Sequence, residues 1–401
     1  RGGIGGGAVI KTVRRFPEGI VQIPPSKSIL HRAIICDALA GGREFPSGVS
    51  EDIDATARCA LALTSGEQNI TLDCGESGST LRFTLPLAPA LGIKKAVFRG
   101  RGRLLRRPMD AYTDELRRHG AHIEEKRDEL IVSGELEAGV YELPGDISSQ
   151  YISGLLFALP LCGDSEIRLT TPLESAGYVE LTIDELQKSG VEIGRGRDAF
   201  YIRGGQKYAR REISAEGDFS QAAFFLVSGA LGCDVECRGL DLRSKQGDME
   251  ILDILKRCGI RVVVTSGGGI KAKPGKILPC DLDASGVPDL VPPVAAMLSF
   301  ASGVSRIYNA GRLRHKESDR LESVRDTLCK LGASVVIDGD TLVINGRNML
   351  EGGEISAYGD HRIAMMGAVA AIRCRWEVRI DGAECVAKSY PDFWSDFEAD
   401  A

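Results

Sequence analysis

The stretch "ELRRHGAHIEE" (residues 115–125) places one glycine between two different sequence patterns. Before Gly120 the residues follow the period of an amphipathic helix, and after it apolar and polar residues alternate as in a strand. Glycine at that junction permits the left-handed backbone that commonly ends a helix. The stretch therefore predicts the end of a helix, a glycine turn and a strand.

Three further stretches have the same pattern and make it a repeat. They are "ELQKSGVEIGR" (185–195), "ILKRCGIRVVV" (254–264) and "TLCKLGASVVI" (327–337), and the four glycines recur every 69 to 73 residues. Between them lies a second element, an apolar helix opened by small or polar residues. Its starts fall near Ser26, Ser77, Ser148, Ser220, Pro288 and Asp360. Such regular spacing indicates repeated supersecondary units, and we expect six, the first one shortened.

The apolar helices predict the order of the layers. The segments "SSQYISGLLFALPL" (148–161) and "DHRIAMMGAVAAI" (360–372) are apolar nearly all round, which is typical of buried helices. Each unit thus carries one buried helix, one amphipathic helix and strands that cover them. A chain of 401 residues is too long for one ordinary core. We therefore expect an α/β fold with two domains of three units each.

The chain ends predict that one domain is discontinuous. The last unit runs out of chain, and strands expected in "AVIKTVRR" (8–15) and "GIVQIPP" (19–25) are expected to complete it. The resulting domains are residues 26–214, and residues 1–25 with 215–401. The first seven residues, "RGGIGGG", follow no strand and are interpreted as a flexible tail, not a dinucleotide-binding loop.

Composition narrows the class of protein. Hydrophobic residues make up 43% of the chain and charged residues 26%, as in a globular protein, and the formal net charge is −6. That charge argues against a nucleic-acid or membrane-surface binder, which carries a basic excess. No apolar run is long enough to span a membrane, so we expect a cytoplasmic protein. The eleven cysteines contain no C-x-x-C pair, so neither a disulfide framework nor a zinc site is indicated.

Lys27 stands in the first turn of the helix expected in "PPSKSILHRAIICDALAGG" (24–42). The positive end of the helix dipole disfavours a cation there by roughly a few tenths of a kcal/mol, unless an anion offsets it. Polar and charged residues also gather at the starts of the other apolar helices. Because free backbone N–H groups at helix starts bind anions, we expect a pocket for an anionic ligand.

Three charged stretches fit this pocket, and each also fits an ordinary structural role. The arginines of "GRGRLLRRP" (100–108) can form a solvated face, "RLRHKESDR" (312–320) a salt-bridged helix start, and "GDHR" (359–362) a capped helix with a structural histidine. His31, beside Arg32, is interpreted as structural. Walker A, nucleophile-elbow and zinc-helix motifs are missing from the sequence. We therefore expect chemistry by Lys, Arg, Asp and Glu on a phosphorylated, carboxylated substrate, without metal or cofactor.

Taken together, the motifs resemble the 5-enolpyruvylshikimate-3-phosphate synthase family over nearly the whole chain. The resemblance lies in ten motifs that follow the family's order: "PSKSxxxR", "GESGSTLRF", "GRGRLLRRP", "GDISSQ", "ESAGY", "EGDFSQA", "PDLVPP", "RHKESDR", "GDHRxAM" and "AKSYPDF". It implies a two-domain inside-out α/β barrel of six units, with parallel helices inside and sheets outside. It also implies the reaction: phosphoenolpyruvate gives its enolpyruvyl group to the 5-hydroxyl of shikimate 3-phosphate, and phosphate is released. We expect a monomer.

The resemblance implies ligands for both substrates. Those of phosphoenolpyruvate are Lys27, Gly78, Arg103, Gln150, Arg320, Arg362 and Lys388. Those of shikimate 3-phosphate are Lys27, Ser28, Arg32, Ser148, Ser149, Gln150, Ser175, Tyr178, Asp289, Arg312 and Lys316. Guanidinium groups hold carboxylate and phosphate oxygens in bidentate pairs, and serine hydroxyls with helix N–H groups suit a phosphate. These residue types therefore agree with the implied substrates.

The implied reaction is an addition followed by an elimination, which requires an acid and a base. By resemblance, Asp289 accepts or orients the hydroxyl proton, while Glu317 with Lys27 handles the methylene proton. The sequence leaves open which of the three moves which proton. Two positions depart from the commonest family pattern: Glu76 and Arg312 each stand where many members have Asn.

Two other functions are alternatives to this one. The enolpyruvyl transferase that acts on UDP-N-acetylglucosamine usually has a cysteine in the arginine-rich loop and Asn after its first lysine. Here Ser28 follows Lys27, and the chain has no cysteine between Cys74 and Cys162. A non-catalytic anion-binding repeat protein is the second alternative. Asp289 and Glu317 argue against it, because carboxylates beside the cations weaken simple phosphate binding.

Overall fold

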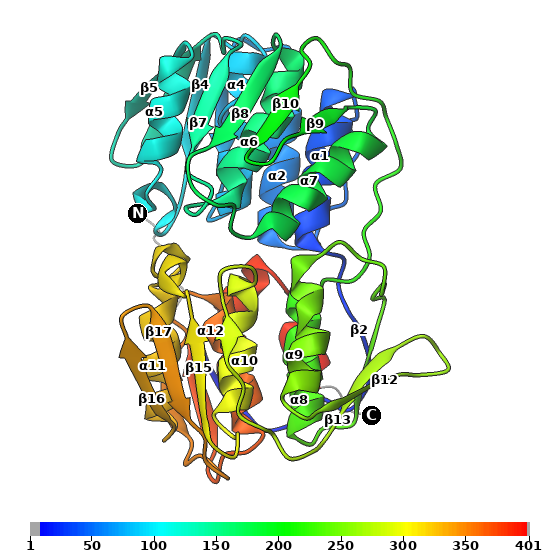
Figure 1. The fold of residues 1–401 in the computed structure, drawn as a ribbon, viewed down its shortest axis with the longest axis vertical. Helices are drawn as coiled ribbons and strands as arrows, with labels where there is room; N and C mark the ends of the chain where they lie inside the picture. Colours follow the sequence, from blue (N-terminus) through cyan, green and yellow to red (C-terminus); the bar gives the residue numbers. More distant parts are fainter. Residues whose placement is uncertain (1–8, 399–401) are drawn as a thin grey trace, which may run out of the picture. The chain divides into compact units, whose positions relative to one another are not determined.

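The structure is a computed structural model that describes residues 9–398, so the predicted N-terminal tail lies outside the described residues. By its internal contacts the chain forms two compact units (Figure 1). The first comprises Pro25–Ala215 and Lys245–Gly247, and is called the middle unit here. The second, called the split unit, comprises residues 9–24, Glu216–Ser244 and residues 248–398.

The middle unit contains two sheets with the same topology. In the orders β3-β4-β6-β5 and β7-β8-β10-β9, the first pair is parallel and the next two pairs are antiparallel. One repeat therefore produces one sheet. The strands are β3 (Asn69–Asp73), β4 (Lys95–Arg99), β5 (Ala121–Glu125), β6 (Glu129–Gly134), β7 (Val140–Leu143), β8 (Ser165–Leu169), β9 (Ile193–Arg195) and β10 (Ala199–Ile202).

The split unit repeats this topology, with strands from the N-terminal segment. The order β14-β15-β17-β16 has the same pattern of parallel and antiparallel pairs, and so does β2-β11-β13-β12. A third sheet has the order β1-β19-β18. The strands are β1 (Ile10–Val13), β2 (Gly19–Gln22), β11 (Val235–Arg238), β12 (Arg261–Val264), β13 (Ile270–Lys273), β14 (Leu282–Asp283), β15 (Val304–Tyr308), β16 (Ser334–Asp338), β17 (Thr341–Asn345), β18 (Gly353–Ser356) and β19 (Val378–Asp381).

The two N-terminal strands do not both complete the last unit. Strand β1 pairs with β19 there, as expected, but β2 pairs in parallel with β11 in another sheet. The reason lies in the repeat itself, because the other three four-stranded sheets take their first strand from just before the buried helix. The residues before the buried helix that precedes β11 form no strand, and β2 supplies the missing neighbour.

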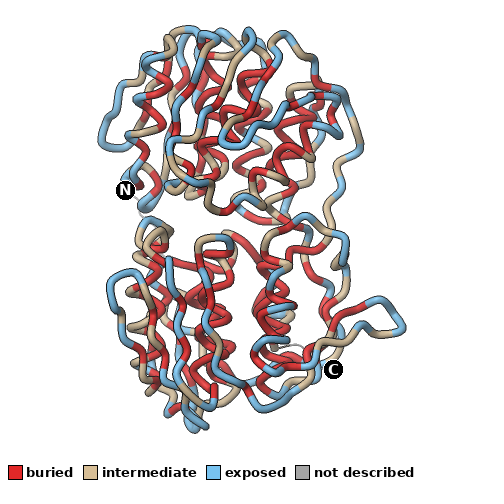
Figure 2. The backbone as a smooth tube through the Cα atoms, in the orientation of Figure 1, coloured by how far each residue is buried: buried red, intermediate tan, exposed pale blue. Residues whose placement is uncertain are grey.

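Six apolar helices lie inside the two units, as the sequence predicts. Every residue of α8 and of α12 is buried, and Figure 2 shows burial concentrated along the helices of each unit. These inner helices are α1 (Lys27–Leu39), α3 (Gly78–Thr84, followed by α4, Leu87–Ala90), α6 (Ser149–Ala158), α8 (Phe219–Leu231), α10 (Val291–Leu298) and α12 (His361–Ala371). The other helices are α2 (Glu51–Leu63), α5 (Asp110–Arg118), α7 (Ala176–Lys188), α9 (Ile251–Arg257), α11 (Arg320–Lys330) and α13 (Phe393–Phe397).

The four repeat glycines adopt the left-handed backbone that the sequence predicts. The φ angles of Gly120, Gly190, Gly259 and Gly332 are +88°, +78°, +80° and +95°. Each ends a helix and starts the next segment, so the repeat identified in the sequence is confirmed at the level of the backbone. Within residues 9–398, no helix is long and apolar enough to cross a membrane.

Candidate functional site

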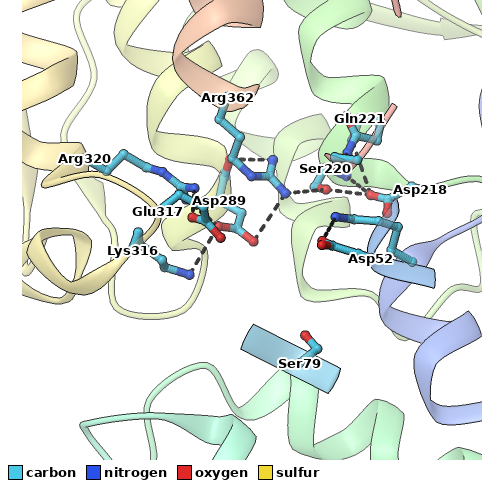
Figure 3. A network of polar contacts seen from close by, with 12 residues as sticks. Asp52, Ser79, Asp218, Ser220, Gln221, Asp289, Lys316, Glu317, Arg320 and Arg362 are labelled. Carbon is cyan, nitrogen blue, oxygen red and sulfur yellow. Dashed lines mark hydrogen bonds and ion pairs between the residues drawn. The ribbon is translucent and has the colours of Figure 1, made fainter. Parts of the chain in front are cut away.

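In the split unit, a buried arginine joins three carboxylates, and Figure 3 labels two of them, Asp289 and Glu317. Arg320 begins α11, and its side chain is only 1% exposed. Its Nε donates to Asp360 Oδ2 at 2.9 Å, Nη1 to Asp289 Oδ1 at 2.9 Å, and Nη2 to Glu317 Oε2 at 2.5 Å. The three acids come from the starts of two inner helices and from the loop before α11, so this arginine fixes three parts of the fold at one point.

The Asp289 carboxylate is surrounded by the three cationic side chains of this cluster. Asp289 lies in the 3₁₀-helix η4 (Pro288–Leu290), which leads into α10. Besides Arg320, its carboxylate pairs with Lys316 Nζ at 3.3 Å and with Arg362 Nη2 at 3.3 Å. Burial alone raises the pKa of Asp289, but Arg362, Lys316 and Arg320 outweigh burial and hold it well below its usual value. The carboxylate is therefore ionised at neutral pH.

The starts of α8 and α12 lie next to this cluster, and each is capped by an aspartate. Asp360 caps α12 by accepting from the Arg362 backbone N–H at 3.0 Å, and Asp218 caps α8 by accepting from the Ser220 N–H at 2.9 Å. Arg362 Nη2 donates to Ser220 Oγ at 2.9 Å, which connects the two helix starts (Figure 3). Lys388 Nζ donates to the carbonyl of Gly359, just before the α12 cap, at 2.8 Å.

The structure thus brings together most of the site residues predicted in the split unit. Asp289, Lys316, Glu317, Arg320 and Arg362 form one cluster of hydrogen bonds and ion pairs. The two other predicted residues of this unit, Lys388 and Arg312, lie in two other elements of the fold. Lys388 contacts the turn before α12, and Arg312 is half-buried in the 3₁₀-helix η5 (Gly311–His315).

In the middle unit, Lys27 has a carboxylate partner. It is the first residue of α1, and its Nζ lies 2.8 Å from Asp52 Oδ2, in the first turn of α2. The two side chains are 14% and 18% exposed. Asp52 offsets part of the cost of a cation at a helix start, and its own position at the start of α2 is favourable for an acid. The fold therefore holds the Lys27 ammonium in place without a substrate.

Gly78 faces two buried arginines and a glutamine. A Cβ atom added at Gly78 would lie 2.7 Å from Arg82 Nη1, 2.9 Å from Arg107 Nη1 and 3.7 Å from Gln150 Oε1. Arg82 Nη1 donates to Gln150 Oε1 at 2.8 Å, and Gln150 Nε2 donates to Ser79 Oγ at 3.0 Å. Only glycine leaves room for these groups beside the start of α3.

Arg82 and Arg107 were missed by the sequence prediction, although both lie in its motifs. Their residues are 7% and 9% exposed, whereas Arg103, the predicted ligand from the same loop, is exposed. The run of arginines indicated that this loop contributes cations to the site. The spacing of residues within a loop, however, does not determine which arginine turns inward. Glu76 lies against this loop, since a Cβ atom at Gly102 would be 2.9 Å from its carboxyl carbon.

The predicted ligands of shikimate 3-phosphate in the middle unit lie at the starts of α1, α6 and α7, except Arg32, which lies one turn into α1. The Arg32 guanidinium donates to the carbonyls of Ser28 at 2.6 Å and Tyr178 at 2.8 Å. Burial lowers the pKa of Arg32 to about 10, so the group stays charged at neutral pH. Ser148 caps α6, directly before Ser149 and Gln150, and Ser175, before α7, has a left-handed φ of +52°. A non-glycine residue in that conformation is uncommon and is often found at functional sites.

Because the family resemblance drawn from the motifs implies that Gly78 is a phosphoenolpyruvate ligand, we expect Gly78→Ala to raise the KM for phosphoenolpyruvate more than that for shikimate 3-phosphate. The added methyl displaces the ends of Arg82 and Arg107, which are flexible, so the folded state is retained. Steady-state kinetics with each substrate varied in turn measures the effect. Gly275→Ala is the matched control, because its Cβ atom would make only an ordinary 3.7 Å contact. Equal changes in both KM values would argue against this placement of Gly78.

Inner helices covered by outer sheets, repeated along one chain, place this protein in the fold class of the solved enolpyruvyl transferases. The enolpyruvyl transferase NikO from Streptomyces tendae has this fold with a TM-score of 0.75 at 17% identity, over 97% of this chain and 96% of that one. Within this class, the chain belongs to the EPSP synthase (3-phosphoshikimate 1-carboxyvinyltransferase) family, whose sequence model matches residues 14–397.

Two individual relatives agree with this family. The 3-phosphoshikimate 1-carboxyvinyltransferase of Clostridium acetobutylicum is 44% identical, over 95% of this chain and 94% of the relative. EPSP synthase from Acinetobacter baumannii has a TM-score of 0.76 at 25% identity, over 97% of both chains. The chain is therefore an enzyme of the shikimate pathway, and it transfers the enolpyruvyl group of phosphoenolpyruvate to shikimate 3-phosphate. The resemblance stated from the motifs is confirmed.

Proposed function

We propose that residues of each unit contribute to this transfer: the Asp289 cluster in the split unit, and the Lys27 and Gly78 groups in the middle unit. The single observation that carries the proposal is the environment of Asp289. Its carboxylate is ionised and lies within 3.3 Å of Lys316, Arg320 and Arg362 nitrogens. A carboxylate and several cations in one cluster can hold an anionic substrate and also accept a hydrogen bond from its hydroxyl group.

In this proposal Asp289 orients the attacking hydroxyl group. Because its pKa is low, Asp289 is a weak base, so it aligns the hydroxyl group and takes its proton only as the carbon–oxygen bond forms. Glu317 or Lys27 supplies a proton to the methylene carbon of phosphoenolpyruvate and takes one back from the resulting methyl group in the elimination. The carbon–oxygen bond to phosphate breaks in that step, and phosphate leaves with the proton held by Asp289. Charge on the departing phosphate is stabilised by guanidinium groups that are already positioned by the fold.

The arginines divide into substrate ligands and structural groups. Arg320 is enclosed by three carboxylates, so its five N–H donors are largely occupied by the protein. We propose that it acts mainly by holding Asp289 and Glu317 in place. Arg82 and Arg107 lie at Gly78 and are proposed as further cations for phosphoenolpyruvate, in addition to Arg103.

We expect Asp289→Asn to lower kcat by about a hundredfold or more, which is the usual contribution of a positioned acid–base group. The substitution keeps the size of the side chain but removes its charge. Release of phosphate from phosphoenolpyruvate, with shikimate 3-phosphate present, measures the reaction. The matched control is Asp283→Asn, an exposed acid in the same unit that accepts from Ser285 N and Asn309 Nδ2.

Retention of more than a tenth of the wild-type kcat by Asp289→Asn would overturn the role proposed for that carboxylate. The absence of phosphate release by the wild-type enzyme would instead contradict the assignment of the reaction. A monomeric state, a cytoplasmic location and the predicted domain boundaries stay predictions.

A further inference from the structure

A chain of buried hydroxyl groups connects three helices of the middle unit. His31 Nδ1 lies 2.6 Å from Thr56 Oγ1, Thr56 Oγ1 lies 2.5 Å from Thr80 Oγ1, and Thr80 Oγ1 donates to Ser77 Oγ at 2.7 Å. His31 is 3% exposed, Ser77 is 2% exposed, and both threonines are fully buried. This series of side-chain contacts thus runs from the interior of α1 through α2 to the first turn of α3.

Counting protons allows this series of hydroxyl groups two directions, because each threonine has one hydroxyl proton. With Thr80 as the donor to Ser77 Oγ, Thr56 donates to Thr80 and can only accept from His31, which puts the ring proton on Nδ1. The opposite direction puts that proton on Nε2. Donation by either threonine to the Asp52 carbonyl, which lies 3.3 Å from Thr56 Oγ1 and 3.4 Å from Thr80 Oγ1, agrees only with the first direction.

The surroundings of His31 keep the ring neutral. Burial, together with the charges of Lys27 and Arg32, holds the pKa of His31 well below its usual value. The ring also packs edge-on against Phe83, with the ring centroids 6.4 Å apart. A neutral imidazole has one N–H group, and the hydroxyl chain uses it as the first donor.

The series of hydroxyl groups ends at Ser77, next to Gly78 of the proposed substrate site. Ser77 Oγ accepts from the Thr80 backbone N–H at 3.2 Å, which caps α3 immediately before Gly78. A second connection lies one helical turn away, where Lys27 pairs with Asp52. His31 follows Lys27 by four residues, and Thr56 follows Asp52 by four, so both pairs lie on facing sides of α1 and α2.

We propose that His31, in the Nδ1–H tautomer, is a positioning residue for the Lys27 and Gly78 groups. It starts a one-way series of donors through Thr56 and Thr80 that keeps Ser77 as the acceptor at the start of α3. The His31–Thr56 contact also sets the register in which Lys27 meets Asp52. This inference rests on the proposed function for its kinetic consequences, but its structural part can be tested without activity.

The tautomer is tested by NMR on the ligand-free enzyme labelled with ¹⁵N in histidine. Long-range ¹H–¹⁵N correlations distinguish a protonated Nδ1 from a protonated Nε2. We expect His31 to show a protonated Nδ1 and an unprotonated Nε2 at pH 7.5. A protonated Nε2 with a bare Nδ1 would reverse the donor series and overturn the proposal.

Kinetics test the positioning role with matched variants. We expect His31→Leu and Thr56→Val each to raise the KM for phosphoenolpyruvate about tenfold, because the donor series is broken. His31→Asn should recover most of the wild-type KM, since its amide nitrogen stands as many bonds from the backbone as Nδ1 and can donate. Thr327→Val is the control for loss of a buried hydroxyl, because Thr327 is equally buried but lies in the split unit.

A merely structural role would give a different pattern. In that case His31→Leu and His31→Asn would lower the melting temperature and leave the KM for phosphoenolpyruvate within twofold, which overturns the inference. Amide hydrogen exchange distinguishes failure of the positioning role of His31 from failure of the proposed function. If the inference holds, exchange of the Thr80 amide is faster in His31→Leu than in wild type, whether or not the enzyme releases phosphate. Unchanged exchange in that variant also counts against it.

Discussion

Replacing Lys27 with Met is expected to lower kcat more than a hundredfold while the melting temperature stays within a few degrees of wild type. The ammonium group lies at the start of α1 and is proposed both to bind the substrates and to take part in proton transfer. Its removal leaves Asp52 unpaired, but that carboxylate is 18% exposed and lies at the favourable end of α2. Phosphate release and thermal unfolding together measure the two effects.

The control for this experiment is Lys188→Met in the same unit. Lys188 lies in the last turn of α7 and pairs with Asp184 at 2.7 Å and with Glu185 at 2.8 Å, so it also loses ion pairs on substitution, while Glu185 keeps its pair with Arg211. It is 48% exposed, and we expect neither kcat nor the melting temperature to change appreciably. If Lys27→Met keeps more than a tenth of the wild-type kcat, Lys27 has no essential role in the reaction.

The parts of the fold that could be predicted are those that the repeat encodes locally. A glycine such as Gly120 ends a helix through its own backbone preference, and an all-apolar helix such as α12 has to be buried wherever it lies. Both properties are contained in about ten consecutive residues. The six inner helices and the four repeat turns therefore follow directly from the sequence.

Pairing between distant segments was less predictable. Residues 8–15 and 19–25 have similar strand patterns, and neither pattern specifies the sheet that it joins. Strand β1 pairs with β19, while β2 pairs with β11, because each sheet lacked a different neighbour. The choice depends on which edges are left open by the rest of the chain, and a local pattern contains no such information.

The sequence also did not predict which side chains point into the protein. Arg103 and Arg107 lie in one loop and differ in burial, and His31 looked like an ordinary histidine within a helix. Its contact with Thr56 joins two different helices, so spacing along α1 gives no sign of it. Motifs therefore identified the loops and helix starts of the site, whereas the particular partners became visible only in the fold.

Arg320→Met is expected to destabilise the split unit by about 3 to 5 kcal/mol, the usual effect of removing one partner from a buried ion pair. The substitution leaves Asp289, Glu317 and Asp360 without their shared cation, and Asp360 is fully buried. Arg325→Met is the control on the same helix. Its partner is Glu322, the two side chains are 40% and 46% exposed, and its loss should cost about 0.5 kcal/mol or less. Urea unfolding of each variant measures the difference.

The pH dependence of this difference shows whether uncompensated charge is the cause. The pKa of Asp289 is lowered in the folded wild-type protein, so its stabilising contribution is complete above the unfolded value of about 3.9 and is lost as the pH falls through the folded value. In Arg320→Met, Asp289 has lost one of the three cations that lower its pKa, so it takes up a proton at higher pH than in wild type. The difference in the free energy of unfolding between wild type and Arg320→Met should therefore be constant from pH 8 to pH 6 and become smaller toward pH 4. A difference that is the same at pH 7 and pH 4 would mean that lost packing of the arginine side chain, and not the three carboxylates, determines the stability of this cluster.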